Sequence, residues 1–264
     1  MTVDEAGTAT AILRVEDLQK RFGGNHAVDG ATFDVARHSI TGLIGPNGAG
    51  KTTCFNCIAG ALKPNGGRVT FEGREITGLP PYRVTALGMS RTFQIPQELG
   101  AMSVLENLML AGLDQAGERL WESWFRPWRV AKQERDLAAR AHELLALVDL
   151  GHLAYELAAN LSGGQRKLLE LARALMPRPT MVLLDEPSAG VNPTLAVKLA
   201  EHIRQVRDEL GVTFLLIAHD MDVVERLCET VVVMASGRVL TEGTPAEVFA
   251  DPEVQDAYLG SQYR

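Results

Sequence analysis

Residues 45 to 52 read Gly-Pro-Asn-Gly-Ala-Gly-Lys-Thr, which fits the pattern G-x-x-x-x-G-K-[ST]. The glycines let backbone N–H groups turn inward around phosphate oxygens. Lys51 adds a positive charge for the outer phosphates, and the Thr52 hydroxyl can ligate Mg2+. Because a short apolar segment precedes the loop and a helical pattern follows it, the sequence predicts a site for ATP and Mg2+. The residues predicted to bind the nucleotide here are Gly45, Pro46, Asn47, Gly48, Ala49, Gly50, Lys51, Thr52 and Thr53.

Acidic residues follow a second apolar segment in a pattern that complements this loop. Met181 to Leu184 is four apolar residues long and leads directly into Asp185 and Glu186. A carboxylate at the mouth of a buried strand can hold Mg2+ through its water shell, so Asp185 is a predicted metal residue. Glu186 lies one residue further on and can orient or deprotonate an attacking water molecule. His219 ends the next apolar segment, where we expect it to contact the γ-phosphate.

A second phosphate-binding surface is predicted far from the first in the sequence. Leu161 to Gln165 reads Leu-Ser-Gly-Gly-Gln and opens a helical segment that runs to Leu175. A serine and two glycines at a helix N-terminus suit an anion, so Ser162, Gly163, Gly164 and Gln165 are further nucleotide-binding candidates. One nucleotide does not need two such surfaces. A head-to-tail dimer accounts for both, with each ATP held between the loop of one subunit and the helix of the other.

The order of these motifs resembles the nucleotide-binding subunit of an ABC transporter. The resemblance runs from about Leu13 to Ser236 and includes Gln94 between the loop and the second surface. It implies that Gln94 contacts Mg2+ and the attacking water and lies where a membrane partner docks. It also implies that Phe22 stacks on adenine, with Val28 beside it. Many family members have Tyr in place of Phe22, and Ala-Gly-Val-Asn at residues 189 to 192 replaces a frequent Ser-Ala-Leu-Asp.

Shorter stretches are similar to the ATPases of branched-chain amino acid importers. They are Arg21–Gly24, Arg91–Gln94, Glu186–Pro193 and the ending from Asp251 to Gly260. The Tyr-Leu-Gly ending also resembles the ATPase of lipopolysaccharide export, which remains the alternative. The importer resemblance implies ATP-driven closure of two ATPase subunits, identical or related, that energises uptake of branched-chain amino acids or related small polar solutes. It also implies transmembrane permease subunits and an extracytoplasmic solute-binding protein as partners.

Composition excludes several other kinds of partner. The 264 residues carry a formal net charge of −7, which argues against a sequence-independent nucleic-acid binder and against adhesion to anionic lipid. No stretch approaches the roughly 18 apolar residues of a membrane span, and the N-terminus is unlike a secretory signal. We therefore expect a cytoplasmic chain, held at the inner face of the membrane by its partners. A soluble ABC ATPase acting on ribosomes or DNA, and an ATP-binding regulator without turnover, are the weaker alternatives.

Alternating strand and helix patterns predict an α/β fold. The resemblance specifies a P-loop NTPase cassette with a mostly parallel core sheet, an antiparallel β part and an inserted helical subdomain. We expect a flexible segment at residues 1–10, the ATPase domain at 11–243 with the helical insertion at about 96–176, and a helical tail at 244–264. Strands are expected at residues 12–18, 31–35, 39–44, 69–71, 181–184 and 212–218, a hairpin around Ser236 and Gly237, and a helix at 51–62.

Two further clusters need an interpretation. Cys54 and Cys57 form a CxxC pair in the helix expected after the loop, and the distant Cys228 completes the three cysteines. We interpret them as small apolar packing residues and not as a redox or zinc pair. Four aromatic residues have the spacing of one helix face, and they either pack on the helical insertion or contact the membrane partner or lipid: Trp121, Trp124, Phe125 and Trp128.

Overall fold

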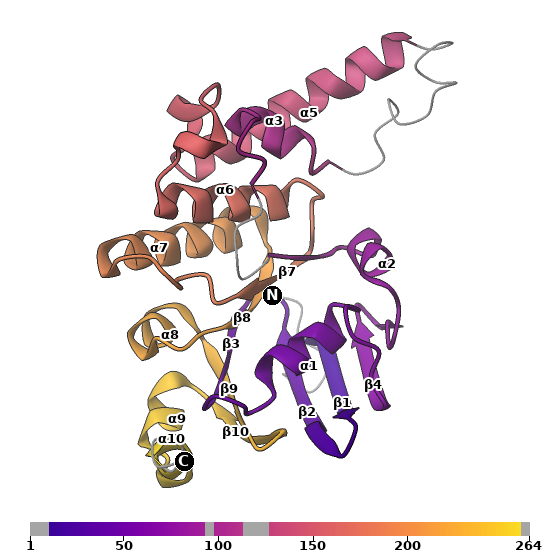
Figure 1. The fold of residues 1–264 in the computed structure, drawn as a ribbon, viewed down its shortest axis with the longest axis vertical. Helices are drawn as coiled ribbons and strands as arrows, with labels where there is room; N and C mark the ends of the chain where they lie inside the picture. Colours follow the sequence, from indigo (N-terminus) through magenta and orange to yellow (C-terminus); the bar gives the residue numbers. More distant parts are fainter. Residues whose placement is uncertain (1–10, 93–97, 113–126, 260–264) are drawn as a thin grey trace.

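The protein folds around a six-stranded sheet, seen in a computed structural model that describes residues 11–92, 98–112 and 127–259 (Figure 1). The strand order is β10-β9-β3-β8-β7-β6, and the strands from β9 to β6 run parallel while β10 is antiparallel to β9. The strands of this sheet are β3 (Ile40–Ile44), β6 (Met89–Arg91), β7 (Met181–Asp185), β8 (Thr213–Ile217), β9 (Thr230–Ala235) and β10 (Arg238–Gly243).

The central strands β3, β7 and β8 are apolar runs because both of their faces are buried. Val182 and Leu184 pack into a cluster with helical residues, whereas Met181 and Leu183 point to the other face. Successive side chains of a strand alternate between faces, so one run supplies two cores. The sheet therefore lies between two hydrophobic layers, and the site forms at the ends of its strands.

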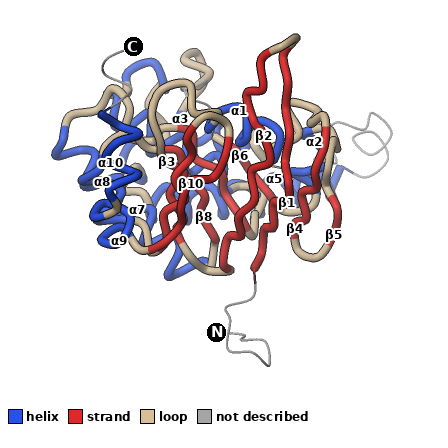
Figure 2. The backbone as a smooth tube through the Cα atoms, turned by 90° about the horizontal axis from the view of Figure 1, so that it is seen from below, coloured by secondary structure: helices blue, strands red, loops and turns tan. Residues whose placement is uncertain are grey.

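A second sheet of four antiparallel strands has the order β2-β1-β4-β5. Its strands are β1 (Ala11–Phe22), β2 (Asn25–Ala36), β4 (Gly66–Phe71) and β5 (Arg74–Glu75). Figure 2 shows its long strands beside α1 (Lys51–Ile58), and their buried residues share one core cluster with that helix. The predicted mostly parallel sheet with an antiparallel β part is confirmed.

The helices fall into two groups in Figure 1. Three of them, with α7 beneath, gather at one end of the molecule, where the sequence predicted helices: α3 (Val104–Met109), α5 (Pro127–Leu147) and α6 (Gly163–Leu175). The remaining helices are α2 (Pro81–Ala86), α7 (Pro193–Leu210), α8 (Met221–Leu227), α9 (Pro245–Ala250) and α10 (Pro252–Leu259), with short 3-10 turns η2 (Gly151–Leu153) and η3 (Ala158–Asn160). In the described ranges, no helix is long and apolar enough to cross a membrane.

Local sequence signals place the ends of several elements. The Asn192 side chain caps α7 by accepting from Leu195 N at 2.9 Å, and Gly211 ends that helix in the left-handed region at φ 65°. Thr244 and Glu247 form the capping box of α9. Helix α1 is shorter than predicted: it ends at Ile58, not at residue 62, because Gly60 turns the chain at φ 74°.

The two unexplained clusters have different outcomes. Cys54, Cys57 and Cys228 are buried and free, which agrees with their interpretation as packing residues. Trp128 is 67% exposed near the start of α5. The other three aromatic residues of its cluster lie outside the described residues, so the packing and contact interpretations both remain predictions.

Candidate nucleotide-binding site

The phosphate-binding loop joins the centre of the sheet to a helix. Strand β3 is fully buried and ends at Ile44, and α1 begins at Lys51. Gly45 has φ 145°, and a Cβ atom there would lie 2.0 Å from the Met234 carbonyl oxygen. Gly50 has φ 98°, and its Cβ would meet the Ala27 carbonyl oxygen at 2.2 Å. Both positions therefore require glycine, which explains the two glycines of the pattern in physical terms.

Lys51 is held over this loop by the loop itself. Its Nζ donates to the carbonyl oxygens of Gly45, at 2.7 Å, and Pro46, at 3.0 Å. Burial lowers the pKa of the Lys51 ammonium, and the nearby Glu186 carboxylate opposes that shift. The two hydrogen bonds described for this ammonium go to neutral carbonyls, so it gains strongly from an anion and the arrangement is suited to phosphate.

Glu186 and His219 meet at the carboxyl ends of neighbouring parallel strands. Strand β7 pairs with β8, and His219 Nε2 lies 2.9 Å from Glu186 Oε1. Because an ionised carboxylate only accepts hydrogen bonds, Nε2 carries the proton in this contact. Glu186 has φ 50°, an uncommon conformation for a non-glycine residue, and its N–H donates to the Ile217 carbonyl at 3.1 Å. Strain and a specific partner together fix the direction of this carboxylate.

A cleft of about 620 Å3 brings the loop and these two residues together. That volume suits a small-molecule ligand. Its wall also includes Phe22, which is 48% exposed and whose ring lies 5.1 Å from Lys20 Nζ. The cleft is lined by Phe22, Asn25, His26, Ala27, Asn47, Gly48, Ala49, Gly50, Lys51, Thr52, Thr53, Glu186, His219 and Ser236.

Sequence reasoning missed part of this wall. Asn25 and His26 follow Phe22 across the turn from β1 to β2, and Ser236 lies in the turn between β9 and β10. In the sequence, these three residues are marked only by their position in or beside a turn. Val28 was a predicted neighbour of adenine, but the structure buries its side chain in the core and places Ala27 on the wall.

Asp185 lies at the end of β7, beside Glu186, and is buried. Arg91 of β6 donates from Nη2 to Asp185 Oδ2 at 3.0 Å. The sequence did not single out Arg91 for this contact.

Within the described residues, no group of three or more His, Cys, Asp or Glu side chains could hold a metal. Mg2+ does not need a group of three such side chains, because it is commonly bound through one or two protein oxygens together with substrate phosphates. The Asp185 carboxylate and the Thr52 hydroxyl are hard oxygen ligands of the fitting kind.

The second predicted surface is ordered but does not line this cleft. Ser162 caps α6, its N–H donates to Gln165 Oε1 at 2.9 Å, and Gln165 N donates back to Ser162 Oγ at 3.4 Å. Gly164 is packed against α7, where a Cβ atom would lie 2.6 Å from Leu195 Cδ1. The described residues that line the cleft include neither these three nor Gly163. Gln94 lies outside the described residues.

The site has a glycine loop between a buried parallel strand and a helix. Two acidic residues lie at the end of another strand of the same sheet. These features define the class of P-loop nucleotide-binding proteins.

Comparisons with known proteins narrow this class. The family model described as ABC transporter matches residues 28–189, and one described as branched-chain amino acid ATP-binding cassette transporter matches residues 238–264. A protein of Archaeoglobus fulgidus named "Probable branched-chain amino acid transport ATP-binding protein LivG" is 42% identical, over 95% of this chain and 96% of its own length. The high-affinity branched-chain amino acid transport ATP-binding protein BraF of Pseudomonas aeruginosa is 39% identical, over 94% and 98%.

A solved structure agrees with these relatives. The ADP conformation of an ATP-binding cassette of an ABC transporter superposes with a TM-score of 0.82 at 39% identity, and the match covers 96% of this chain and all of that one. The chain belongs to the ABC transporter family, as one of its ATP-binding cassettes, and this family hydrolyses ATP.

Proposed function

We propose that the chain is the ATP-hydrolysing subunit of a transporter that imports branched-chain amino acids or related small polar solutes. The relatives named above act in branched-chain amino acid transport, and the match of residues 238–264 to a model for such transporters supports the same cargo class. The tail is where the resemblance to lipopolysaccharide export arose, so this match favours the amino acid importers.

One observation carries the proposed mechanism: of the two predicted phosphate-binding surfaces, only the first contributes described residues to the cleft. Residues 47–53 of the loop line the cleft, whereas Ser162 caps α6 and Gly164 packs against Leu195 of α7. A head-to-tail pair of subunits places the second surface of one over the cleft of the other. ATP then bridges the two subunits, and its hydrolysis lets them part.

Within this site, each residue has a proposed role. Lys51 and the backbone of Gly45–Thr53 bind the phosphates, while Phe22, with Val28 behind the wall, supports adenine. Glu186 orients or deprotonates the attacking water, and His219 holds Glu186 and contacts the γ-phosphate. Thr52, Asp185 and Gln94 would hold Mg2+, which when bound neutralises phosphate charge during transfer.

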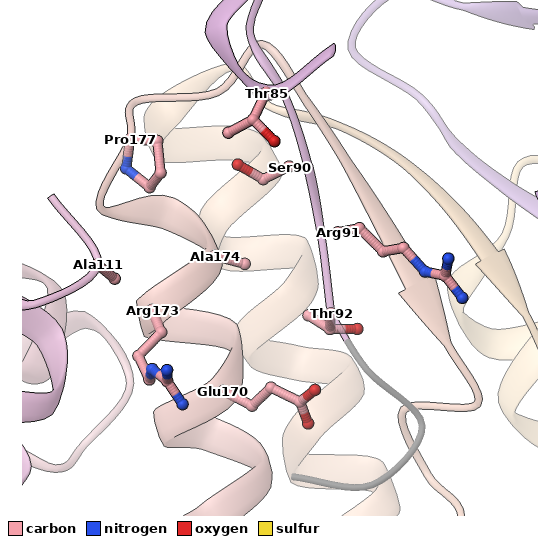
Figure 3. A pocket seen from close by; sticks show the side chains of 9 residues that line it. All are labelled: Thr85, Ser90, Arg91, Thr92, Ala111, Glu170, Arg173, Ala174 and Pro177. Carbon is pink, nitrogen blue, oxygen red and sulfur yellow. The ribbon is translucent and has the colours of Figure 1, made fainter. Parts of the chain in front are cut away.

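The permease subunits are proposed to dock beside β6, the strand that precedes Gln94. A pocket of about 190 Å3 lies there between β6, α2 and α6, as Figure 3 shows. Its wall includes Ser90, which is 4% exposed and whose Oγ has no hydrogen-bond partner among the described residues. An unsatisfied buried hydroxyl costs free energy, which an incoming partner segment with a polar group relieves.

The remaining parts of the assembly follow from the same proposal. We place the chain at the cytoplasmic face of the membrane, held by the permeases, with a second ATPase subunit and an extracytoplasmic solute-binding protein in the same system. Residues 11–243 serve as the ATPase domain, with the helical insertion at about 96–176 and a tail at 244–264.

The variant Glu186→Gln tests this mechanism, because it keeps the shape of the side chain and removes its ability to accept a proton. We expect the variant to bind ATP as the parent does, to lose about a hundredfold or more in hydrolysis, and to elute as a dimer when ATP is present. The measurements are phosphate release, equilibrium ATP binding and size-exclusion chromatography with light scattering. Parent-like turnover by Glu186→Gln would contradict the catalytic role of this carboxylate, and a monomer in saturating ATP would contradict the dimer.

A further inference from the structure

The side chain of Arg91 reaches from β6 to two elements that carry the nucleotide site. Its Nη2 donates to Asp185 Oδ2 at 3.0 Å, and its Nη1 donates to Asn56 Oδ1 at 2.5 Å. Asn56 belongs to α1, the helix that begins with Lys51. The guanidinium also lies over the ring of Phe55, 5.5 Å from its centroid. One side chain therefore ties the end of β7 to the helix of the phosphate-binding loop.

The carboxylate that Arg91 holds is shielded from water. The side chain of Asp185 is 4% exposed, and that of Arg91 is 19% exposed. A buried carboxylate needs a charged partner, and its removal leaves an uncompensated charge. A guanidinium is planar and presents its N–H groups as a rigid fork, so its bond to Asn56 fixes the direction from which it meets Asp185. Lysine has no such fork and cannot serve both oxygens in the same geometry.

Strand β6 also connects this ion pair to the proposed docking pocket. In Figure 3, the Ser90 side chain points toward Thr85 and Ala174, while the Arg91 guanidinium points away from Arg173 and Glu170. The next residue, Thr92, binds the same neighbouring strand, because its N–H donates to Leu183 O at 2.9 Å and its Oγ1 accepts from Asp185 N at 3.4 Å. A displacement of β6 from the pocket side thus moves the partner of Asp185.

We propose that Arg91 is a positioning residue that sets the Asp185 carboxylate for the Mg2+-nucleotide complex and links it to the strand of the docking pocket. The proposal rests on the proposed function, in which Asp185 holds Mg2+. Arg91 does not contact the reacting atoms. It acts through Asp185, so its loss changes how much Mg2+ the protein needs and leaves the binding of metal-free nucleotide intact.

The test measures Mg2+ dependence in Arg91→Ala and Arg91→Lys. The two readouts are the Mg2+ concentration for half-maximal ATP hydrolysis and the Mg2+ dependence of ATP binding by titration calorimetry, with binding in EDTA as the reference. We expect Arg91→Ala to raise the Mg2+ requirement about tenfold to a hundredfold in both readouts, as for residues that orient metal ligands. Binding in EDTA should change less than twofold. The Mg2+ requirement of Arg91→Lys should lie between those of Arg91→Ala and the parent. This variant tests the proposal if the alanine variant does not fold.

Three further variants make the result specific. Asn56→Ala removes one contact of the guanidinium and should raise the Mg2+ requirement less than Arg91→Ala does. Arg37→Ala removes a partly exposed ion pair with Glu72, away from the cleft, and should leave the requirement unchanged. If Asp185→Asn does not raise the requirement, the Mg2+ role of Asp185 fails, and the Arg91 proposal fails with it. If Asp185→Asn raises it and neither Arg91 variant does, the role of Arg91 alone is overturned.

Discussion

In the proposed function, the cleft contains residues that bind phosphate and residues that bind the base. Lys51, Glu186 and His219 are fixed by hydrogen bonds or ion pairs within the protein. Phe22 is different, because its ring is half exposed at the end of β1 and contacts the ammonium of Lys20. A planar aromatic face at the edge of the cleft is suited to stacking on a purine ring.

Replacing Phe22 by Ala should therefore weaken ATP binding. Stacking of a base on an aromatic side chain contributes about 1–3 kcal/mol, so we expect the dissociation constant to rise between about fivefold and about 150-fold. Phe22→Tyr keeps the stacking face and should bind as the parent does. Tyr82→Ala removes an exposed aromatic ring outside the cleft and serves as the control. If titration calorimetry gave Phe22→Ala and Tyr82→Ala the same affinity for ATP, Phe22 would not contribute to binding of the base.

The cysteines provide a second prediction at this scale. Burial raises the pKa of Cys57 to about 11 and that of Cys228 to about 12, and it raises the pKa of Cys54 further. Since the thiolate is the reactive form, a raised pKa lowers the reactive fraction at neutral pH. We expect the native protein to react slowly with a thiol reagent at about pH 8, and all three thiols to react at once in denaturant. Rapid labelling of the native protein would contradict the packing interpretation.

Elements were predictable where a local signal marks their ends. The apolar runs became the buried strands β3, β7 and β8, and α7 is bounded by Asn192 and Gly211, residue types that commonly cap and end helices. The end of α1 was missed because Gly60 interrupts a continuous apolar pattern, and periodicity alone does not show where a glycine takes positive φ. The Arg91–Asp185 pair was missed for another reason: its partners are 94 residues apart and meet only because β6 and β7 pair.

The cap of α7 offers a test of one such local signal. Asn192→Ala removes the acceptor for Leu195 N, so one N–H at the start of an 18-residue helix loses its partner. We expect a loss of about 1 kcal/mol in the free energy of unfolding, measured with urea on the nucleotide-free protein. Asn192→Ser retains a side-chain acceptor and should recover most of that loss. If Ala and Ser variants were equally stable, the cap would contribute nothing.

At the scale of the whole molecule, the phosphate-binding loop and the predicted second surface at Ser162 to Gln165 do not line the same cleft among the described residues. The helices of the second surface gather at one end of the molecule, and the antiparallel sheet with α1 lies toward the other (Figure 1). The comparisons place the chain in a family of transporter cassettes. Under the proposed function, a second subunit completes the site, so we expect hydrolysis to depend on the assembly.

Mixing two inactive variants tests whether a second copy of this chain completes the site. Lys51→Ala disables the loop and leaves Ser162 to Gln165 intact, whereas Ser162→Arg blocks the second surface with a bulky cation and leaves the loop intact. Each variant alone should lack ATP hydrolysis, because every site in its homodimer contains one disabled half. A mixed dimer contains one site with both halves intact, and random pairing of equal amounts makes half of the dimers mixed. If the two sites act independently, head-to-tail symmetry then predicts about a quarter of the parent activity.

Phosphate release should rise with the amount of either variant until the two are equal. A mixture of Lys51→Ala with Glu186→Gln should stay inactive, because both changes disable the same half. Recovery in that control, or none in the first mixture, would exclude a composite site between two copies of this chain.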